Sequence, residues 1–134
     1  MKILKIDHIG IAVNNLKKSL EFYTKILGLE ADGIEVFEEQ KVRVGFLSCG
    51  DSRFELMESI TTDGAIAKYI EKNGEGIQHI SLRVDNIESA LTELKEKEIR
   101  LINDTPQCFE GGAKIAFINP KATTGVLIEL CERA

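Results

Sequence analysis

Apolar residues alternate with polar or small ones in several short stretches of the chain. Alternation with a period of two is typical of β-strands, because successive side chains point to opposite faces. Over residues 8–13, Ile9 and Ile11 fall on one face and His8 falls on the other. Similar patterns predict strands over 42–47, 54–57, 79–84, 114–118 and 125–131.

A helix is predicted directly after the first strand. Asn14 or Asn15 is a suitable N-cap. Gly28 is suitably placed to end the helix. Between them, apolar residues recur at helical spacing at positions 16, 20, 23 and 27.

Two further helices are predicted. One runs through Ile66 and Ile70, with Thr62 or Asp63 as its cap. In the other, positions 87, 91 and 94 form an apolar stripe, preceded by a pattern resembling a capping box, Asp85 with Glu88.

The chain repeats itself, and the repeat predicts its architecture. The opening segment IDHIGIAVNN (6–15) is echoed 71 residues later by IQHISLRVDN (77–86). Each half ends in a strand that carries a glutamate, Glu55 in the first and Glu129 in the second. We therefore expect an α+β fold in a single domain, 1–134. Module one covers about 1–60, a connecting helix about 62–74 and module two about 75–134.

Composition narrows the classes of function. The net charge of -5 and the pI near 5.1 argue against a nucleic-acid-binding or anionic-membrane-binding surface. Neither a signal-peptide core nor an apolar run of about twenty residues is present. Cys49, Cys108 and Cys131 form no CxxC pair, which indicates reduced thiols. We expect a soluble cytoplasmic protein.

Four residues are candidates for metal binding. Strand alternation places His8, Glu55, His79 and Glu129 on faces that the predicted helices do not cover. Imidazole nitrogens and carboxylate oxygens suit a divalent first-row metal, with positions left open for water or substrate. A single such residue is more simply a hydrogen-bonded or solvated strand residue. Because all four match across the repeat, the pattern favours a metal site.

Residues 7–13, 74–80 and 120–130 resemble the vicinal oxygen chelate superfamily, and within it the methylmalonyl-CoA epimerases. The resemblance implies paired βαβββ modules whose curved sheets enclose a metal-centred cleft. It also implies His8, Glu55, His79 and Glu129 as ligands of cobalt, nickel, manganese or zinc, with Glu129 also the proton-transfer base. Superfamily relatives are often dimers and exposed sheet edges are commonly covered, so a homodimer is expected.

The resemblance implies an epimerase that moves the α-proton of methylmalonyl-CoA, or a similar acyl-CoA, through a metal-stabilised enolate. Two alternatives are a glyoxalase I (lactoylglutathione lyase) acting on a glutathione hemithioacetal, and a non-catalytic binding protein of the drug-resistance type.

The chain departs from the epimerase pattern at Gln78, Asn119 and Lys41. A further departure concerns the second acid or base. Val44 stands where some relatives supply a second carboxylate, so Glu38, Glu39 or a bound water would serve instead.

Three strand arginines, Arg43, Arg53 and Arg83, are candidates for holding a substrate carboxylate, although such arginines are more often solvated.

Overall fold

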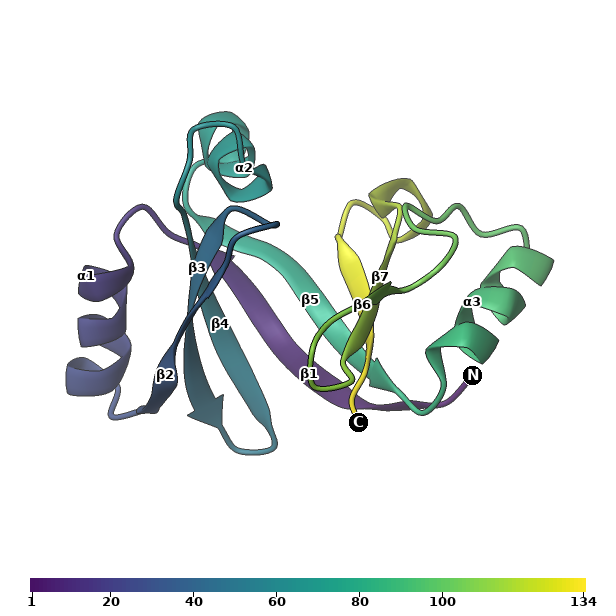
Figure 1. Cartoon of the computed structure of the whole chain (residues 1–134), viewed down its shortest axis with the longest axis horizontal. Coiled ribbons are helices and arrows are strands. Elements are labelled where there is room, and N and C mark those ends of the chain that lie inside the picture. The colour runs from purple at the N-terminus through teal and green to yellow at the C-terminus, as the bar shows by residue number, and fades with distance from the viewer. The chain divides into compact units, whose positions relative to one another are not determined.

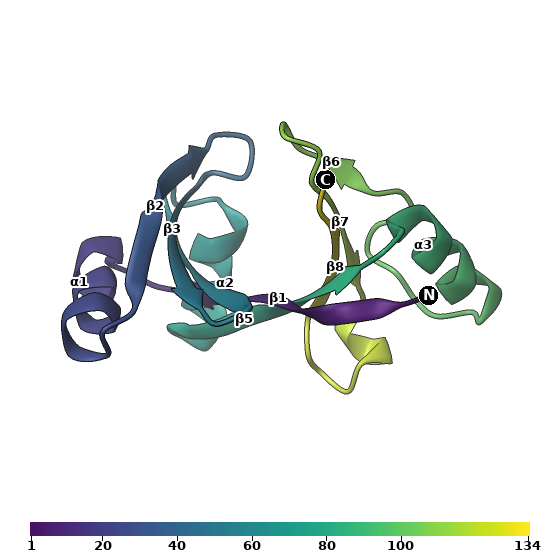
Figure 2. The same cartoon turned by 90° about the horizontal axis from the view of Figure 1, so that it is seen from below.

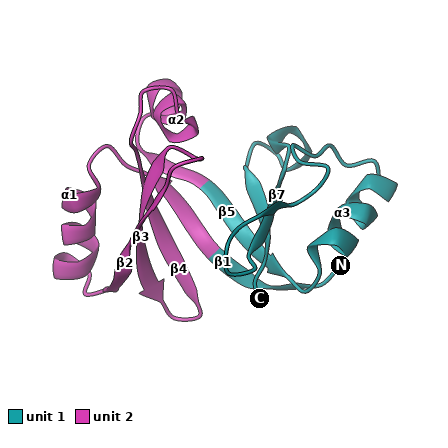
Figure 3. Cartoon of the chain, viewed as in Figure 1, with its two compact units in different colours: residues 1–7, 79–134 teal, residues 8–78 magenta.

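The computed structural model describes residues 1–134 and divides into two compact units (Figure 3). Unit 2 is continuous and covers residues 8–78, whereas unit 1 combines residues 1–7 with 79–134. Two strands are therefore divided between the units, β1 (Ile3–Ala12) and β5 (Gly76–Val84).

Unit 2 contains the first βαβββ module and the connecting helix (Figure 1). Its strand order is β2-β3-β4-β1, with β1 parallel to β4 and the other neighbours antiparallel. After β1, its elements are α1 (Leu16–Glu21) with the π-helical turn η1 (Phe22–Ile26), β2 (Glu30–Phe37), β3 (Val42–Cys49), β4 (Ser52–Ser59) and α2 (Ala65–Asn73).

Unit 1 contains the second module, in which the strand order is β5-β8-β7-β6. β5 and β8 are parallel, as β1 and β4 are in unit 2, and the expected pair of βαβββ modules is confirmed. After β5, its elements are α3 (Ile87–Glu96), β6 (Gln107–Cys108), β7 (Lys114–Ile118), the short 3₁₀ helix η2 (Pro120–Ala122) and β8 (Ile128–Glu132).

The beginning of α1 follows the prediction, since Asn15 is its N-cap and accepts a hydrogen bond from the Lys18 amide at 3.0 Å. Gly28 follows the π-helical turn with a φ of 75°, a conformation that favours glycine. Position 27 differs from the prediction: Leu27 is 55% exposed and lies outside the core.

The predicted caps of the other two helices are wrong. Gly64, and neither Thr62 nor Asp63, stands at the N-cap of α2 without a side-chain cap. Asn86, and not Asp85, caps α3 by accepting from the Ser89 amide at 2.9 Å. Glu88, the other half of the predicted capping box, instead pairs with Lys114 at 2.9 Å.

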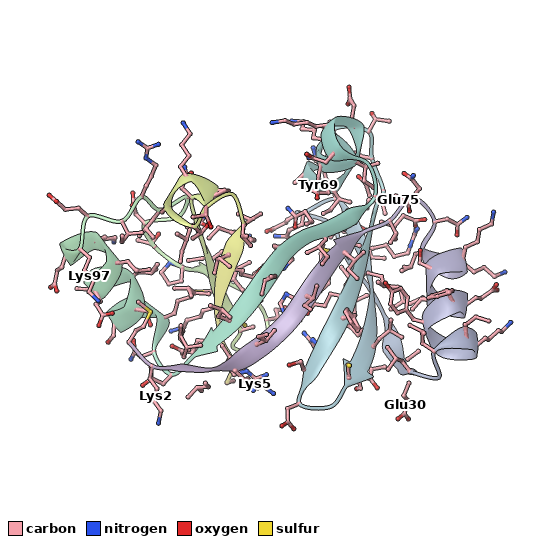
Figure 4. The ribbon with its side chains drawn as sticks, turned by 180° about the vertical axis from the view of Figure 1, so that it is seen from behind. Lys2, Lys5, Glu30, Tyr69, Glu75 and Lys97 are labelled. Carbon is pink, nitrogen blue, oxygen red and sulfur yellow. The ribbon has the colours of Figure 1, made fainter.

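The turn between α2 and β5 is held by two side chains labelled in Figure 4. Tyr69 donates its hydroxyl to the Ile77 carbonyl at 2.7 Å, and the Glu75 carboxylate accepts from the Asn14 amide at 2.9 Å. These contacts tie the start of β5 to the end of β1 within unit 2.

Unit 2 has apolar clusters on both sides of its strands. Figure 2 shows α1 and α2 on opposite sides of β3 and β4. The cluster beneath α1 contains Val13, Leu16, Leu47 and Leu56. The cluster beneath α2 contains Ala12, Val42, Val44, Phe46, Met57 and Ile66.

The second cluster corrects the expectation that no helix covers the strand face bearing His8 and Glu55. Ala12 and Met57 share that face, yet they pack with Ile66 of α2. The alternating pattern assigns residues to two faces, but it does not say which face a connecting helix will cover.

Unit 1 has one core cluster, formed by α3 against β5, β7 and β8. Of the predicted core residues in β5, Val84 is 1% exposed and Leu82 packs against this cluster. The buried residues of the cluster are Val84, Ile87, Ala90, Leu91, Leu94, Ala116, Ile118 and Leu130.

No helix combines the length and apolar character that a membrane span requires.

Candidate metal centre

In unit 2, the parallel pairing of β1 with β4 brings His8 and Glu55 together. His8 is opposite Arg53 and Gly10 is opposite Glu55, so the imidazole and the carboxylate project from the same face. His8 Nδ1 lies 3.2 Å from Glu55 Oε2. His8 is 3% exposed and the Glu55 side chain 13%, so the pair is largely buried.

Arg53 contacts the same oxygen of the Glu55 carboxylate as His8 does. Its Nε and Nη2 atoms lie 3.0 and 2.8 Å from Glu55 Oε2. The guanidinium also lies 4.7 Å from the centre of the Phe46 ring, within the range of a cation–π contact. Charge-assisted bonds of this kind fix the orientation of a carboxylate.

In unit 1, the parallel pairing of β5 with β8 brings His79 and Glu129 together. Ser81 is directly opposite Glu129 and donates its hydroxyl to Glu129 Oε1 at 2.8 Å. His79 Nε2 lies 3.5 Å from Glu129 Oε2. The imidazole ring makes an edge contact with Phe117, at 5.8 Å between ring centroids.

The Glu129 side chain is more deeply buried than that of Glu55, at 5% against 13% exposed. His79, Ser81 and Glu129 are 5%, 0% and 4% exposed. Removing an ionised carboxylate from water costs on the order of several kcal/mol, unless a positive charge or hydrogen bonds compensate this penalty. Arg53 supplies a positive charge to Glu55, whereas Ser81 offers Glu129 a neutral hydroxyl.

Each pair can act in two ways. The simpler is a hydrogen bond between imidazole and carboxylate within each unit. Alternatively, the nitrogen and the oxygen of each pair are two ligands of a divalent cation, because these atoms lie within 4.8 Å of each other. The buried carboxylates and the borderline nitrogen and oxygen donors fit such a cation.

The four candidate ligands therefore form two matched pairs, His8 with Glu55 and His79 with Glu129. The convergence of both pairs on one ion stays a prediction. The sequence analysis missed the contacts that Arg53 and Ser81 make with the glutamates. A signal was available, because residues two apart on a strand share a face: Arg53 lies on the face of Glu55, and Ser81 lies on the face of His79.

The other acid–base candidates lie in different surroundings. Val44 is 4% exposed within the apolar cluster beneath α2, and its aliphatic side chain has no group that can transfer a proton. Glu38 and Glu39 are exposed in the turn between β2 and β3.

Two of the candidate arginines pair with carboxylates outside the His–Glu pairs. Arg43 Nη1 lies 2.5 Å from Glu58 Oε1. Arg83 Nη2 lies 2.7 Å from Asp7 Oδ1.

A sequence model of the Glyoxalase/Bleomycin resistance protein/Dioxygenase superfamily matches residues 5–130. The chain belongs to this superfamily. The α+β fold with two βαβββ modules agrees with that membership.

Three superfamily members illustrate the similarity. The uncharacterised protein YqjC of Bacillus subtilis is 41% identical over 128 residues, which are 96% of this chain and 91% of that protein. Human mitochondrial methylmalonyl-CoA epimerase is 35% identical over 127 residues, 94% of this chain and 72% of that protein.

The third is a solved structure, a variant of Streptomyces coelicolor methylmalonyl-CoA epimerase in complex with 2-nitronate-propionyl-CoA. It superimposes with a TM-score of 0.90 at 36% identity and covers 99% of this chain and 96% of that chain.

Proposed function

We propose that the chain is a metal-dependent epimerase that moves the α-proton of methylmalonyl-CoA or a similar acyl-CoA. The main support is the pair of buried His–Glu arrangements at matching positions of the two modules. Similarity to epimerases, one of them solved with an acyl-CoA analogue, supports the substrate class.

In this proposal the two units act as one domain, and His8, Glu55, His79 and Glu129 hold one divalent cation. Cobalt, nickel, manganese and zinc all accept such a nitrogen and oxygen ligand set. When bound, the cation would supply the positive charge that stabilises an enolate oxygen.

Glu129 is the proposed base that removes the α-proton. The Ser81 hydroxyl donates to Oε1 of its carboxylate at 2.8 Å, which holds the carboxylate in one orientation. Burial keeps most bulk water away from the carboxylate. Inversion requires a proton on the opposite face, which Glu38, Glu39 or a water molecule would supply.

Deuterium incorporation tests the proposal. Metal-loaded protein in deuterium oxide should place deuterium on the α-carbon of methylmalonyl-CoA, because inversion requires the C–H bond to break. A parallel incubation with methylglyoxal and glutathione would form a stable thioester if the chain were a lactoylglutathione lyase. Mass spectrometry follows both reactions.

Glu129→Gln is the decisive variant. An amide keeps an oxygen that can act as a ligand, but it cannot accept a proton near neutral pH, so exchange should fall about 100-fold or more. Exchange that survived in this variant would assign the base to another residue. A metal-loaded wild type without either reaction would favour the binding-protein alternative.

We also propose that the protein is a cytoplasmic homodimer. The edge strand β2 exposes Ile34 and Val36 at 54% and 48%, and an apolar strand edge of this kind is commonly covered by another copy. The three free cysteines accord with a reducing compartment. Light scattering should give twice the chain mass of 14.9 kDa, and a monomer at micromolar concentration would contradict the dimer.

A further inference from the structure

The repeat breaks at the position directly opposite each candidate glutamate. Gly10 in β1 is opposite Glu55, and Ser81 in β5 is opposite Glu129; the two positions correspond in the repeat. Glycine has no side chain to offer the carboxylate across the ladder. Serine has one, and its hydroxyl donates to Glu129 Oε1 at 2.8 Å. The modules therefore differ where a neighbouring strand can contact the glutamate.

A second break lies on the strand that carries each glutamate. Two residues before Glu55 stands Arg53, whose Nε and Nη2 atoms contact Glu55 Oε2. Two residues before Glu129 stands Leu127, which has no polar side-chain atom. Within unit 2 the carboxylate thus receives a guanidinium, and within unit 1 it receives a hydroxyl.

The contacts also involve different carboxylate oxygens. In unit 2, the imidazole and the Arg53 guanidinium both lie near the same atom, Glu55 Oε2. In unit 1, His79 Nε2 lies 3.5 Å from Glu129 Oε2, while Ser81 donates to Oε1. Contacts at both oxygens restrict the rotation of a carboxylate about its last bond. Ser81 therefore fixes which oxygen of Glu129 faces the imidazole.

The two neighbours differ in the hydrogen bonds that they can make. An arginine has donors, no acceptor and a permanent charge, so Arg53 stabilises Glu55 as a carboxylate. A serine hydroxyl both donates and accepts. Ser81 can donate to Glu129 as a carboxylate and can rotate to accept from it as a carboxylic acid. It can therefore keep a hydrogen bond before and after a proton is transferred.

We propose that these neighbours give the two glutamates different roles: Arg53 positions Glu55 as a ligand only, and Ser81 positions Glu129 as both ligand and base. This inference rests on the proposed epimerase function. In the transfer, the α C–H bond of the substrate breaks, its electron pair stays on the substrate as the enolate, and the proton forms an O–H bond on Glu129. Arg53 and Ser81 act through the carboxylates and are positioning residues.

Kinetics and metal affinity, measured on the same variants loaded with Co²⁺, test the different roles. Ser81→Ala should lower kcat for deuterium exchange into methylmalonyl-CoA about 10-fold at saturating Co²⁺, because a group that orients a metal ligand typically contributes this much. Its KM should change less than about twofold, since Ser81 acts through Glu129. Arg53→Leu, which copies position 127, should lower Co²⁺ affinity about 10-fold and leave kcat at saturating Co²⁺ within about twofold of wild type.

Ser59→Ala is the matched control. It removes a hydroxyl that donates to the Thr61 carbonyl at 2.6 Å, outside both His–Glu pairs. It should change kcat and Co²⁺ affinity less than about twofold. The different roles would be refuted if Ser81→Ala kept the wild-type kcat, or if Arg53→Leu lowered kcat as much as Ser81→Ala. Should Ser81→Ala fail to fold, Ser81→Cys keeps a weaker donor, and an unchanged kcat there would refute the role.

A double-mutant cycle gives a readout that does not depend on activity. Calorimetric titration should show that Ser81→Ala lowers Co²⁺ affinity about 10-fold in the wild-type background. In a Glu129→Ala background the same change should have less than about a twofold effect, because the carboxylate through which Ser81 acts is gone. Equal effects in the two backgrounds would overturn the role of Ser81. Glu129→Leu, which fills more of the vacated volume, replaces Glu129→Ala if that variant does not fold.

The outcomes separate this inference from the proposed function. A wild type that exchanges deuterium into methylmalonyl-CoA, with Ser81→Ala equally active, overturns the role of Ser81 and leaves the epimerase standing. A wild type that exchanges no deuterium overturns both.

Discussion

At the scale of single residues, the three cysteines lie in contrasting environments. Cys49 and Cys108 are exposed, whereas Cys131 is buried on β8, two residues after Glu129. Burial raises the pKa of the Cys131 thiol to about 12, with smaller and partly opposing effects from the charges of Arg133 and Asp7. Since the thiolate is the reactive form, this cysteine should be inert in the folded protein.

Titration with Ellman's reagent at pH 8 checks this. Cys49 and Cys108 should react quickly in the native protein, and Cys131 should react only after a denaturant is added. A Cys131→Ala variant should lose the slow thiol and keep both fast ones. Three thiols reacting at similar rates without denaturant would contradict the prediction.

Asp63 and Lys41 provide a second test at this scale. Lys41 Nζ lies 2.7 Å from Asp63 Oδ2, and this hydrogen bond, with one from Thr61, lowers the pKa of Asp63 from 3.8 to about 2. The folded-state pKa is below the unfolded one. The stabilisation is therefore present above about pH 4 and is lost as the pH falls through about 2.

The pKa of Asp63 can be followed by NMR of its carboxyl carbon. In wild type it should titrate near the lowered value, and in Lys41→Met its pKa should return toward 3.8. Glu88 is a comparison within the same protein, because Lys114 lowers its pKa by an equivalent hydrogen bond that Lys41→Met leaves intact. An unchanged Asp63 titration in the variant would show that Lys41 is not the cause.

At the scale of elements, the repeat extends to how each module begins its helix. Glu58, in β4, accepts a hydrogen bond from the Leu16 amide at 3.0 Å, at the start of α1. Glu132, in β8, accepts from the Ile87 amide at 2.9 Å, at the start of α3. Each of these glutamates lies three residues after a proposed metal ligand on the same strand. In each module, one strand therefore supplies both the contact at the start of the helix and a residue of the candidate site.

Replacing Glu132 tests this element. Glu132→Ala should lower the free energy of unfolding by about 1–2 kcal/mol, because a helix amide loses its charged acceptor. Glu132→Gln, which keeps an acceptor oxygen, should lose less, and Glu96→Ala on the exposed end of α3 should be near neutral. Urea denaturation measures all three. Equal losses in the Ala and Gln variants would contradict a role for the hydrogen bond.

Alternation and the repeat predicted the paired modules and six of the eight strands, because burial on a sheet leaves a period-two record in the sequence. Strands β2 and β6 were not predicted. The two patterns could not predict the π-helical turn or the cap at Asn86. The π-helical turn depends on packing around Phe22–Ile26. The cap at Asn86 lies beside Asp85, and aspartate is as good an N-cap residue as asparagine. The two His–Glu pairs were predictable because they occupy matching positions in the two copies of the repeat. The partners of the arginines were not predictable, since long side chains reach across elements.

At the scale of the whole molecule, the proposed metal site makes both modules necessary for binding. Purified protein should carry about one divalent ion per chain, and His8→Ala and His79→Ala should each lose it, because each removes one of four ligands. Elemental analysis measures the content, with Glu96→Ala as the surface control. Loss in one histidine variant and full occupancy in the other would show that a single unit binds the ion.

Metal removal should lower thermal stability, because a ligand that binds the folded chain stabilises it by mass action. Differential scanning calorimetry of the protein before and after chelation should show a lower midpoint without metal. The His8→Ala variant is the control, and its midpoint should not respond to chelator. An equal response in both would attribute the effect to a different ion.

The division of β1 between the two units has a consequence for folding during synthesis. Residues 8–78 form a continuous unit and can make their contacts as soon as they leave the ribosome. Asp7, however, finds its partners Arg83 and Arg133 only 76 and 126 residues later along the chain. Until β5 is made, its carboxylate must stay hydrated and the first seven residues lack their partners Arg83 and Asp85, so a nascent chain presents a free strand to neighbouring polypeptides during the first part of its translation.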